Sequence, residues 1–536
     1  MALGAAYHHY LQLAGDHGTA THALLLGVLI FLVIRLVSAR RTGTTSANKR
    51  KQQQRLPLPP SPPGKLPIIG HLHLIGAETH ISIRDLDAKH GRNGLLLLRI
   101  GAVPTLFVSS PSAADAVLRT QDHIFASRPP SMAAEIIRYG PSDVAFVPYG
   151  EYWRQGRKLL TTHMLSTKKV QSFRHGRQEE VRLVMDKIRA AATAAPPAAV
   201  DLSDLLSGYT NDVVCRAVLG ASHRNQGRNR LFSELTEINV SLLGGFNLED
   251  YFPPNMAMAD VLLRLVSVKA RRLNQRWNDV FDELIQEHVQ SRPSGESEES
   301  EADFIHVLLS IQQEYGLTTD NLKAILVDMF EAGIETSYLT LEYGMAELIN
   351  NRHVMEKLQT EVRTTMRSPD GKKLDMLAEE DLGSMPYLKA TIKETLRLHP
   401  PAPFLLPHYS TADSEIDGYF VPAGTRVLVN AWALGRDRTT WEKPEEFMPE
   451  RFVQEPGAVD VHMKGKDLRF IPFGSGRRIC PGMNFGFATM EIMLANLMYH
   501  FDWEVPGSAA GVSMDESFGL TLRRKEKLLL VPRIAS

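Results

Sequence analysis

The sequence predicts a mainly α-helical protein with a small β portion, organised as one large domain behind an N-terminal transmembrane helix. From residue 65 to the C-terminus, apolar residues recur mostly at helical spacing, with no repeat and no linker long enough to divide the stretch. Short β-like segments interrupt this pattern, and an uncharged apolar run stands near the N-terminus. The chain has 536 residues, of which 43% are hydrophobic, so it can bury a large core.

The apolar run covers residues 23–34 and extends past Arg35 to residue 37. We expect residues 23–37 to form a transmembrane anchor behind a short luminal N-terminus, residues 1–22. Basic residues follow the run and no acid occurs between the run and Glu78, a charge asymmetry that places the C-terminal side in the cytoplasm. The Asn239 sequon should then remain unglycosylated. The alternative is a cleaved signal peptide, but its basic residues would precede the apolar run and a small-residue cleavage site would follow it.

Residues 38–64 are predicted to be a basic and proline-rich linker, with five prolines between Pro57 and Pro63. Proline fixes φ and favours an extended, semi-rigid strut, so we expect this segment to connect the membrane with the body. The body, residues 65–536, should carry surface loops at residues 190–199 and 291–303. Its β-like segments are residues 95–100, 105–108, 426–429 and 528–531.

The most informative predicted helix runs from residue 319 to residue 350, after a start rich in capping residues. At 1.5 Å per residue it would be about 48 Å long, enough to cross the domain. Leu322, Leu326 and Met329 mark the stripe that we expect to be buried. Gly333 then precedes the polar residues Glu335 and Thr336, and a polar cluster midway along a core helix needs a partner or a function.

Charge and cysteine content exclude several classes of protein. The chain has 60 basic and 61 acidic residues, a balance that argues against nucleic acid as a partner. Its two cysteines, Cys215 and Cys480, exclude a disulfide scaffold and a four-cysteine zinc site. Neither C-x-x-C-H nor H-E-x-x-H occurs, so covalent haem attachment and zinc hydrolysis lack support. Cys215 lies in an apolar helical context and is predicted to be a core residue.

Cys480 lies in the segment F-G-S-G-R-R-I-C-P-G, residues 473–482, ahead of an apolar helical stretch over residues 483–498. Backbone amides at the start of that helix would lower the pKa of the thiol and hold a thiolate ligand. Gly476 and Gly482 would let the backbone approach a flat macrocycle, and Arg478 could pair with one of its carboxylates. Cys480 is therefore the predicted metal ligand.

This segment, with Phe473, Arg478 and Cys480 at their positions, resembles the F-x-x-G-x-R-x-C-x-G motif of the cytochrome P450 superfamily. Further motifs in the family's order extend the resemblance over essentially the whole chain. Glu394 and Arg397 are similar to its E-x-x-R helix, and Arg451 lies in a segment like its P-E-R-F sequence. On a helix, Glu394 and Arg397 share one face, so the three should form a buried triad. The resemblance implies a single P450-type domain that binds haem b through the thiolate of Cys480.

The segment A-G-I-E-T, residues 332–336, resembles the family's oxygen-activation motif A-G-x-[DE]-T. The resemblance implies that Glu335 and Thr336 are catalytic and deliver protons to bound dioxygen. The alternative for a mid-helix threonine is a hydrogen bond to its own helix backbone. By the same resemblance, Trp153, Arg157 and His408 join Phe473 and Arg478 in binding the haem.

The chain has no dinucleotide fingerprint and too few residues for a flavin domain. The resemblance therefore implies that electrons come from NADPH-cytochrome reductase. It also implies a single-pass protein of the endoplasmic reticulum membrane with a cytoplasmic catalytic domain. The pocket walls expected by family position are residues 131–147, 244–246, 401–404 and 518–519 and the helix face around Met329 and Ala332. They are largely apolar and suit a small, flat, neutral molecule.

Residues 61–76, 242–252 and 405–410 resemble a plant group, the grass monooxygenases that oxidise indole stepwise to benzoxazinoid (DIBOA) defence compounds. The resemblance implies hydroxylation of indolin-2-one to 3-hydroxyindolin-2-one with O₂. A sister step on indole, 3-hydroxyindolin-2-one or a benzoxazinone stays open. So do a haem-thiolate isomerase or dehydratase that needs no reductase, and a non-catalytic haem sensor. One departure is Ile334, where this group more often has threonine, and we expect it to tune the pocket.

Overall fold

The computed structural model describes residues 56–220, 227–244, 248–252, 257–290, 302–365, 374–453, 465–508 and 511–535. The predicted luminal segment, the predicted anchor and most of the predicted linker lie outside these ranges, as does most of the predicted loop at 291–303. Among the helices of the described ranges, none is long and apolar enough to cross a membrane. The division into residues 1–22, 23–37, 38–64 and 65–536 stays a prediction.

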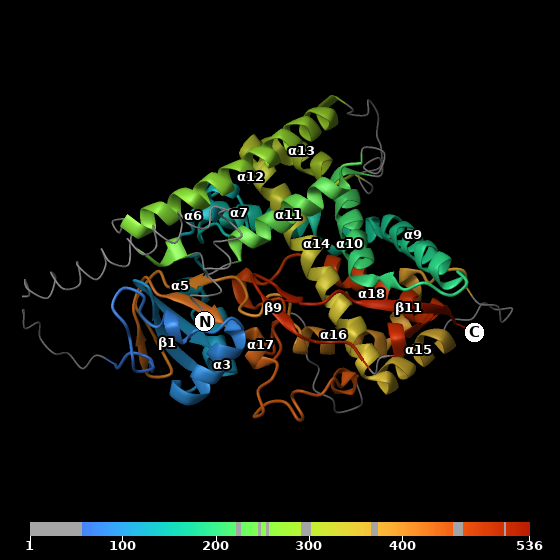
Figure 1. The fold of residues 1–536 in the computed structure, drawn as a ribbon. Helices are drawn as coiled ribbons and strands as arrows, with labels where there is room; N and C mark the ends of the chain where they lie inside the picture. The colour runs from blue at the N-terminus through green and yellow to red at the C-terminus, as the bar shows by residue number, and fades with distance from the viewer. Residues whose placement is uncertain are drawn as a thin grey trace, which may run out of the picture.

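Helix α14 spans Thr319–Asn350, the predicted bounds, and runs through the middle of the body (Figure 1). A capping box fixes its start: the Thr318 hydroxyl accepts a hydrogen bond from the Asn321 amide, and the Asn321 side chain accepts one from the Thr318 amide. The predicted stripe is buried, but so is most of the rest of the helix, including Glu335. Helices pack around α14 on several sides, which a one-sided stripe did not predict.

The helices that contact α14 include α10, α11, α16 and α18. Their bounds are Leu202–Leu219, Asn229–Leu243, Pro386–Leu398 and Met483–His500. The longer outer helices are α3 (Thr79–His90), α9 (Arg174–Ala192), α12 (Ala257–Gln290), α13 (Phe304–Tyr315) and α15 (Arg352–Thr365). The shorter ones are α4 (Pro111–Asp115), α5 (Asp122–Phe125), α6 (Met132–Ile137), α7 (Glu151–Leu159), α8 (Thr167–Ser172) and α17 (Ala431–Leu434).

The largest sheet has the strand order β1-β2-β7-β4 and joins the N-terminal part of the body with residues beyond 400 (Figure 1). Strand β1 pairs antiparallel with β2, which pairs parallel with β7. The bounds are Leu95–Ile100, Val103–Val108, Arg426–Val429 and His408–Tyr409. Strands β1 and β7 have the predicted bounds, and β2 begins two residues before the predicted segment.

Three smaller sheets complete the β portion of the described chain. One has the order β3-β11-β8, and the other two are the pairs β9–β10 and β5–β6. The bounds are Val200–Asp201, Leu529–Ile534, Phe501–Glu504, Glu516–Phe518, Leu522–Arg524, Ser414–Ile416 and Tyr419–Val421. The mainly helical fold with a small β portion is confirmed.

The described part of the proline-rich segment lies against the body. The carbonyl of Pro60 accepts a hydrogen bond from the amide of Leu97 in β1, at 2.7 Å. The carbonyl of Pro57 accepts one from Phe420 in β6, at 2.8 Å. Because proline carbonyls remain free to accept, the segment is attached to two sheets of the body, at Pro57 and at Pro60.

The predicted triad is present and fully buried at its centre. Both Glu394 oxygens accept hydrogen bonds from Arg397, at 2.7 and 2.8 Å, and Arg451 donates to one of them at 3.1 Å. Arg397 also donates to the carbonyls of Pro444 and Glu446. The triad therefore ties α16 to the segment that leads toward Cys480, and the prediction is confirmed.

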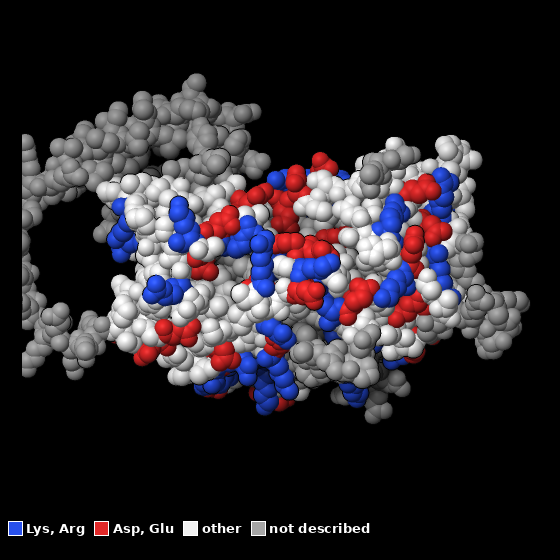
Figure 2. Space-filling view, turned by 90° about the horizontal axis from the view of Figure 1, so that it is seen from below, with Lys and Arg blue, Asp and Glu red and all other residues white. Residues whose placement is uncertain are grey.

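The balanced charge of the chain is visible on the surface. On the face in Figure 2, lysine and arginine side chains are interspersed with aspartate and glutamate. This distribution does not offer nucleic acid a continuous basic stripe on that face.

Candidate functional site

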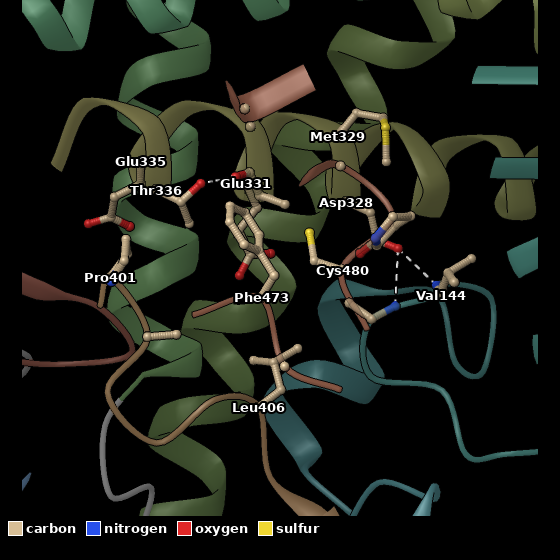
Figure 3. A pocket seen from close by; sticks show the side chains of 18 of the residues that line it. Val144, Asp328, Met329, Glu331, Glu335, Thr336, Pro401, Leu406, Phe473 and Cys480 are labelled. Atoms are coloured by element: carbon tan, nitrogen blue, oxygen red, sulfur yellow. Dashed lines mark hydrogen bonds between the residues drawn. The ribbon is translucent and has the colours of Figure 1, made fainter. Parts of the chain in front are cut away.

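All eight predicted site residues line one cavity of about 310 Å³. They are Trp153, Arg157, Glu335, Thr336, His408, Phe473, Arg478 and Cys480. Helix α14 forms one wall, and the loop that carries Cys480 forms another (Figure 3). The cavity is thus built from segments more than 300 residues apart in sequence.

The Cys480 loop is closed by a hydrogen bond from the Cys480 amide to the Phe473 carbonyl, at 2.9 Å. Gly476 has φ of +65°, and a Cβ there would lie 1.7 Å from the Leu118 carbonyl oxygen. This glycine is therefore required by backbone packing, which corrects the expectation that it serves the approach to a macrocycle. Gly482 is the N-cap of α18, next to the thiol.

The predicted effect of the helix start on Cys480 is present but does not dominate. Burial raises the pKa of the Cys480 thiol above its ordinary value, while the Gly482 amide and the Arg157 charge lower it. The sequence-based expectation of a lowered pKa overlooked this burial. A thiol at this position becomes a thiolate when a metal ion replaces its proton.

Arg478 is held rigidly beside the cavity. It donates to the carbonyls of Ala126, Val144 and Val147 at 2.7, 3.1 and 2.6 Å, and its guanidinium lies over the Trp153 ring. Burial, together with the Arg128 charge, lowers the pKa of Arg478 to about 8. A carboxylate bound beside Arg478 would stabilise the charged guanidinium and raise this pKa again.

Arg157 and Trp153 come from helix α7. Among the described residues, neither the Arg157 guanidinium nor the Trp153 indole N–H has a recorded hydrogen bond, and both side chains line the cavity. Burial lowers the pKa of Arg157, and the nearby Cys480 raises it. These donors are therefore available to an anionic group in the cavity.

His408 is neutral as the structure stands. Its Nδ1 lies 2.9 Å from the Phe125 carbonyl, and burial with the Arg128 and Arg478 charges lowers its pKa to about 3. It can serve as a cation, as predicted from the resemblance, when a carboxylate beside it raises this pKa. Arg128 is a cavity residue that the sequence analysis missed, and it donates to the carbonyls of Ala145, Leu406 and Pro407.

On α14, the Thr336 hydroxyl donates to the Ala332 carbonyl at 2.7 Å, the backbone interaction that was the alternative to catalysis. Its oxygen lone pairs remain available to accept from a water molecule or a ligand. Gly333 is needed for packing, because a Cβ there would lie 2.8 Å from a methyl of Val214 in α10.

Glu335 is buried, and its partners come from strand β10 and from Thr521, the residue before that strand. Its Oε1 accepts hydrogen bonds from the Thr521 hydroxyl, at 2.9 Å, and from Arg523, with which it forms an ion pair. The Arg523 side chain is 35% exposed, so the pair reaches from the cavity toward solvent. Sequence reasoning missed Thr521 and Arg523 because nothing local connects them with a residue more than 180 positions earlier.

The cavity wall is less apolar than predicted. Arg138, Asp328 and Glu331 all line it, and Arg138 forms ion pairs with both carboxylates. Asp328 also accepts from the amides of Val144 and Ala145, at 2.8 and 3.3 Å (Figure 3). The prediction of a largely apolar wall is therefore wrong for this side.

Other expected wall residues lie elsewhere. Residues 245–246 are outside the described ranges, and neither Phe404 nor Phe518 lines the cavity. Ile334 is buried in the core and does not line the cavity either, so its expected role in tuning the pocket is not supported. Cys215 is buried as predicted, and burial raises the pKa of its thiol.

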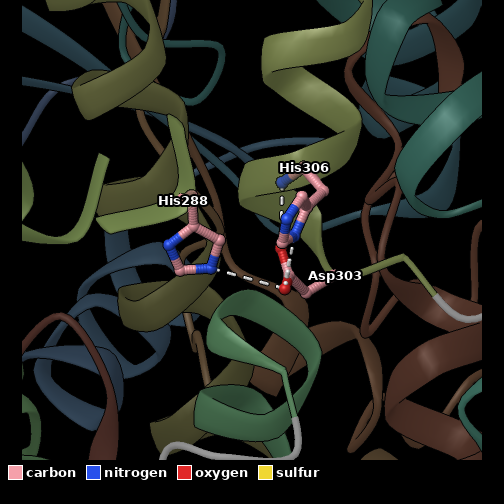
Figure 4. Close-up of side chains that lie close together, drawn as sticks. All are labelled: His288, Asp303 and His306. Carbon is pink, nitrogen blue, oxygen red and sulfur yellow. Dashed lines mark hydrogen bonds and ion pairs between the residues drawn. The ribbon is translucent and has the colours of Figure 1, made fainter. Parts of the chain in front are cut away.

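A second group of side chains in the described residues has the composition of a metal site (Figure 4). His288 at the end of α12 lies near Asp303 and His306 at the start of α13. Asp303 Oδ2 lies 2.8 Å from His306 Nδ1 and 3.4 Å from His288 Nε2, and Asp303 Oδ1 caps α13 by accepting from the His306 amide. Ion pairing and capping account for this arrangement, which joins the two helices.

The arrangement around Cys480 fits a flat, iron-containing cofactor with carboxylate groups. One buried thiol faces the cavity, and Arg157 and Trp153 leave donors open there, with Arg478 and His408 beside them. The cavity also contains apolar side chains such as Leu165, Val240 and Met329. This donor set is that of a haem-thiolate enzyme.

Residues 59–531 match the cytochrome P450 family, so the chain belongs to that family and is a haem-thiolate monooxygenase. Its cofactor is haem with an axial cysteine thiolate.

The chain is 98% identical to the indolin-2-one monooxygenase of Zea mays over the full length of both proteins. It is 59% identical to the 3-hydroxyindolin-2-one monooxygenase of Zea mays, over 100% of this chain and 99% of that one. A zebra fish cytochrome P450, in a structure with abiraterone, has a TM-score of 0.69 at 24% identity. That likeness covers 86% of this chain and 100% of the other, and it shows the fold alone.

Proposed function

We propose that the protein hydroxylates indolin-2-one at C3, giving 3-hydroxyindolin-2-one in benzoxazinoid biosynthesis. The observation that carries this proposal is the 98% identity to a protein of that name over the whole chain. The cavity supports it, since the α14 wall opposite the Cys480 loop offers a small bicyclic molecule both apolar and polar contacts.

The reaction inserts one oxygen atom of O₂ into a C–H bond and reduces the other to water, consuming one NADPH and one proton. Haem with an axial thiolate supplies the activation of dioxygen when it is bound. The electrons come from NADPH-cytochrome reductase, and the protein is anchored by residues 23–37 in the endoplasmic reticulum membrane, with its body, residues 65–536, in the cytoplasm.

Within this proposal, Cys480 holds the iron and Phe473 packs beside it. Trp153, Arg157 and Arg478 bind the haem carboxylates, and His408 joins them once its pKa is raised. On the other wall, the Thr336 hydroxyl holds a proton donor in the cavity. Glu335 passes protons inward from the solvent side, through its contacts with Thr521 and Arg523.

The test is product identification with the full-length protein in membranes that contain NADPH-cytochrome reductase. Indole, indolin-2-one, 3-hydroxyindolin-2-one and a benzoxazinone are supplied separately under ¹⁸O₂. We expect labelled 3-hydroxyindolin-2-one from indolin-2-one and little product from the others. A labelled product from another of the four would assign a sister step instead. Conversion without NADPH consumption would indicate an isomerase or dehydratase.

A further inference from the structure

One carboxylate oxygen in the cavity wall is left without a protein partner. Glu331 on α14 is 8% exposed and lines the cavity. Its Oε2 accepts from two donors: the Arg138 guanidinium, and the side-chain amide of Asn239 at 2.9 Å. Among the described residues, no hydrogen bond is recorded for the other oxygen, Oε1. Since both protein donors converge on Oε2, Oε1 remains an open acceptor.

The neighbouring Asp328 is paired more completely, whereas Glu335 also has one oxygen, the buried Oε2, without a protein partner among the described residues. Asp328 Oδ1 accepts from Arg138 at 2.8 Å, and Asp328 Oδ2 accepts from the amides of Val144 and Ala145. Both oxygens of Asp328 are thus occupied by the protein. Asp328 is a positioning residue that fixes Arg138, and through Arg138 it fixes the carboxylate of Glu331.

The charge of this cluster selects the kind of ligand atom that Oε1 accepts. One guanidinium, that of Arg138, faces the two carboxylates of Asp328 and Glu331. A carboxylate oxygen accepts hydrogen bonds, so the open oxygen of Glu331 favours a ligand that carries a donor. The cavity also contains apolar residues such as Met329 and Val240, which suit a neutral ring.

Glu331 is also well placed along the helix. It lies five residues before Thr336, about 7.5 Å along the helix axis at 1.5 Å per residue. A small ring held at Glu331 therefore stays within the cavity between α14 and the Cys480 loop.

We propose that Glu331 recognises the substrate by accepting a hydrogen bond from the N–H of its cyclic amide, and that Asn239, Arg138 and Asp328 hold its carboxylate in place. The inference rests on the proposed function, because indolin-2-one carries one N–H, next to its carbonyl. It makes Glu331 a specificity-determining residue.

The first experiment uses the unaltered holoprotein and needs no variant. Binding of indolin-2-one, N-methylindolin-2-one and benzofuran-2-one is measured by the change in the haem absorption spectrum. Benzofuran-2-one replaces the N–H with oxygen at nearly the same shape, so it separates hydrogen bonding from steric effects. We expect both analogues to bind about 10-fold or more weakly than indolin-2-one, the size of one lost hydrogen bond to a buried charge. Equal affinity for all three overturns the proposal.

The second experiment compares the binding of indolin-2-one and benzofuran-2-one to the unaltered protein and to Glu331→Gln. The glutamine oxygen turns toward Arg138 and Asn239, so its NH₂ group faces the substrate N–H, and two donors then meet. We expect indolin-2-one to bind about 10-fold more weakly to this variant. Benzofuran-2-one, which lacks the N–H, should bind at least as well as to the unaltered protein. An equal loss for both ligands overturns the proposal.

Met329→Leu is the matched control, because it changes an apolar residue of the same wall and should alter the affinity for both ligands alike. The spectrum of the reduced carbon monoxide complex reports how much of each variant is correctly loaded with haem. If the unaltered protein binds indolin-2-one and yields no 3-hydroxy product, the proposed function fails while the recognition of N–H stands. If the product forms and Glu331→Gln has no selective effect, the recognition fails alone.

Discussion

Two buried ionic clusters in this protein use the same kinds of side chain and differ in how completely their polar atoms are paired. In the triad of Glu394, Arg397 and Arg451, both carboxylate oxygens have protein donors. In the cavity cluster, Glu331 has one oxygen with donors and one open. A closed cluster can contribute only to folding, whereas an open one in a cavity has a hydrogen bond to offer to a ligand. The contrast separates structural charge from functional charge, and variants can test it.

The largest expected effect concerns the open cavity, at its thiol. Cys480→Ser should abolish the thiolate-specific absorption band of the reduced carbon monoxide complex, together with all hydroxylation, because a serine hydroxyl does not replace the thiolate. The matched control is Cys215→Ser, which alters the chain's other cysteine, a buried core residue. It should keep the band. A normal band in Cys480→Ser would remove Cys480 as the ligand.

The next effect concerns the closed cluster. Arg397→Leu leaves the buried Glu394 carboxylate with Arg451 and the Met448 amide as donors, both on Oε1. Breaking a buried pair in this way costs about 3–5 kcal/mol of unfolding free energy. We expect little folded, haem-loaded protein, measured by denaturant unfolding and haem content. Arg533→Leu is the control. Its ion pair with Glu504 is about half exposed, so its loss should cost far less stability. Comparable stability of the two variants would contradict the structural role of the triad.

Thr336→Ala tests the open cavity with a smaller effect. Loss of its hydroxyl should leave stability nearly unchanged and lower the product formed per NADPH consumed about 10-fold or more, since a positioned proton donor contributes roughly 10²–10⁴-fold to a rate. The measurement is NADPH consumption against product. Thr391→Ala is the control, because Thr391 makes the same kind of helix hydrogen bond, to Tyr387, away from the cavity. If Thr336→Ala forms as much product per NADPH as the unaltered protein, the Thr336 hydroxyl has no catalytic role and serves only its hydrogen bond to the helix backbone.

The contrast between the clusters also explains what could be predicted from the sequence. Helix α14 and the Glu394–Arg397 pair were predictable because their signals are local: capping residues in one case and an i, i+3 spacing in the other. The participation of Arg451 was predicted from the order of the family's motifs. Cys480 and Arg478 were predicted from the chemistry of their loop and the other six site residues from the resemblance, and the structure brings all eight into one cavity.

The contacts that sequence reasoning missed are long-range. Glu335 meets Arg523, and Glu331 meets Arg138, across helices and strands whose packing no local pattern encodes. The burial of Cys480 is of the same kind, because its pKa depends on what the fold places around it. Gly476 shows a further limit: its motif position was recognised, but its reason, the close carbonyl of Leu118, lies in the tertiary structure.

The smallest predicted effect concerns a third ionic cluster, His288, Asp303 and His306, which is paired but lies partly open to solvent. Burial lowers the pKa of His288, but Asp303 raises it more, and the net shift is upward. Burial raises the pKa of Asp303, but its histidine and amide partners lower it more, and the net shift is downward. A raised histidine pKa stabilises the fold below the ordinary value of about 6.5, and this contribution is lost as pH rises through the raised pKa. A lowered aspartate pKa stabilises above about 3.9 and is lost as pH falls through the lowered value.

The pair should therefore contribute fully between about pH 4 and 6.5. His288→Gln should lower the unfolding free energy by at most about 1 kcal/mol in that window, and the difference from the unaltered protein should shrink toward pH 9. Denaturant unfolding at several pH values measures it, with His353→Gln, at an exposed position, as the control. A difference that stays constant from pH 5 to pH 9 would show that His288 acts through packing and its contact with the Leu284 carbonyl. The cluster would then contribute to folding alone, like the closed triad.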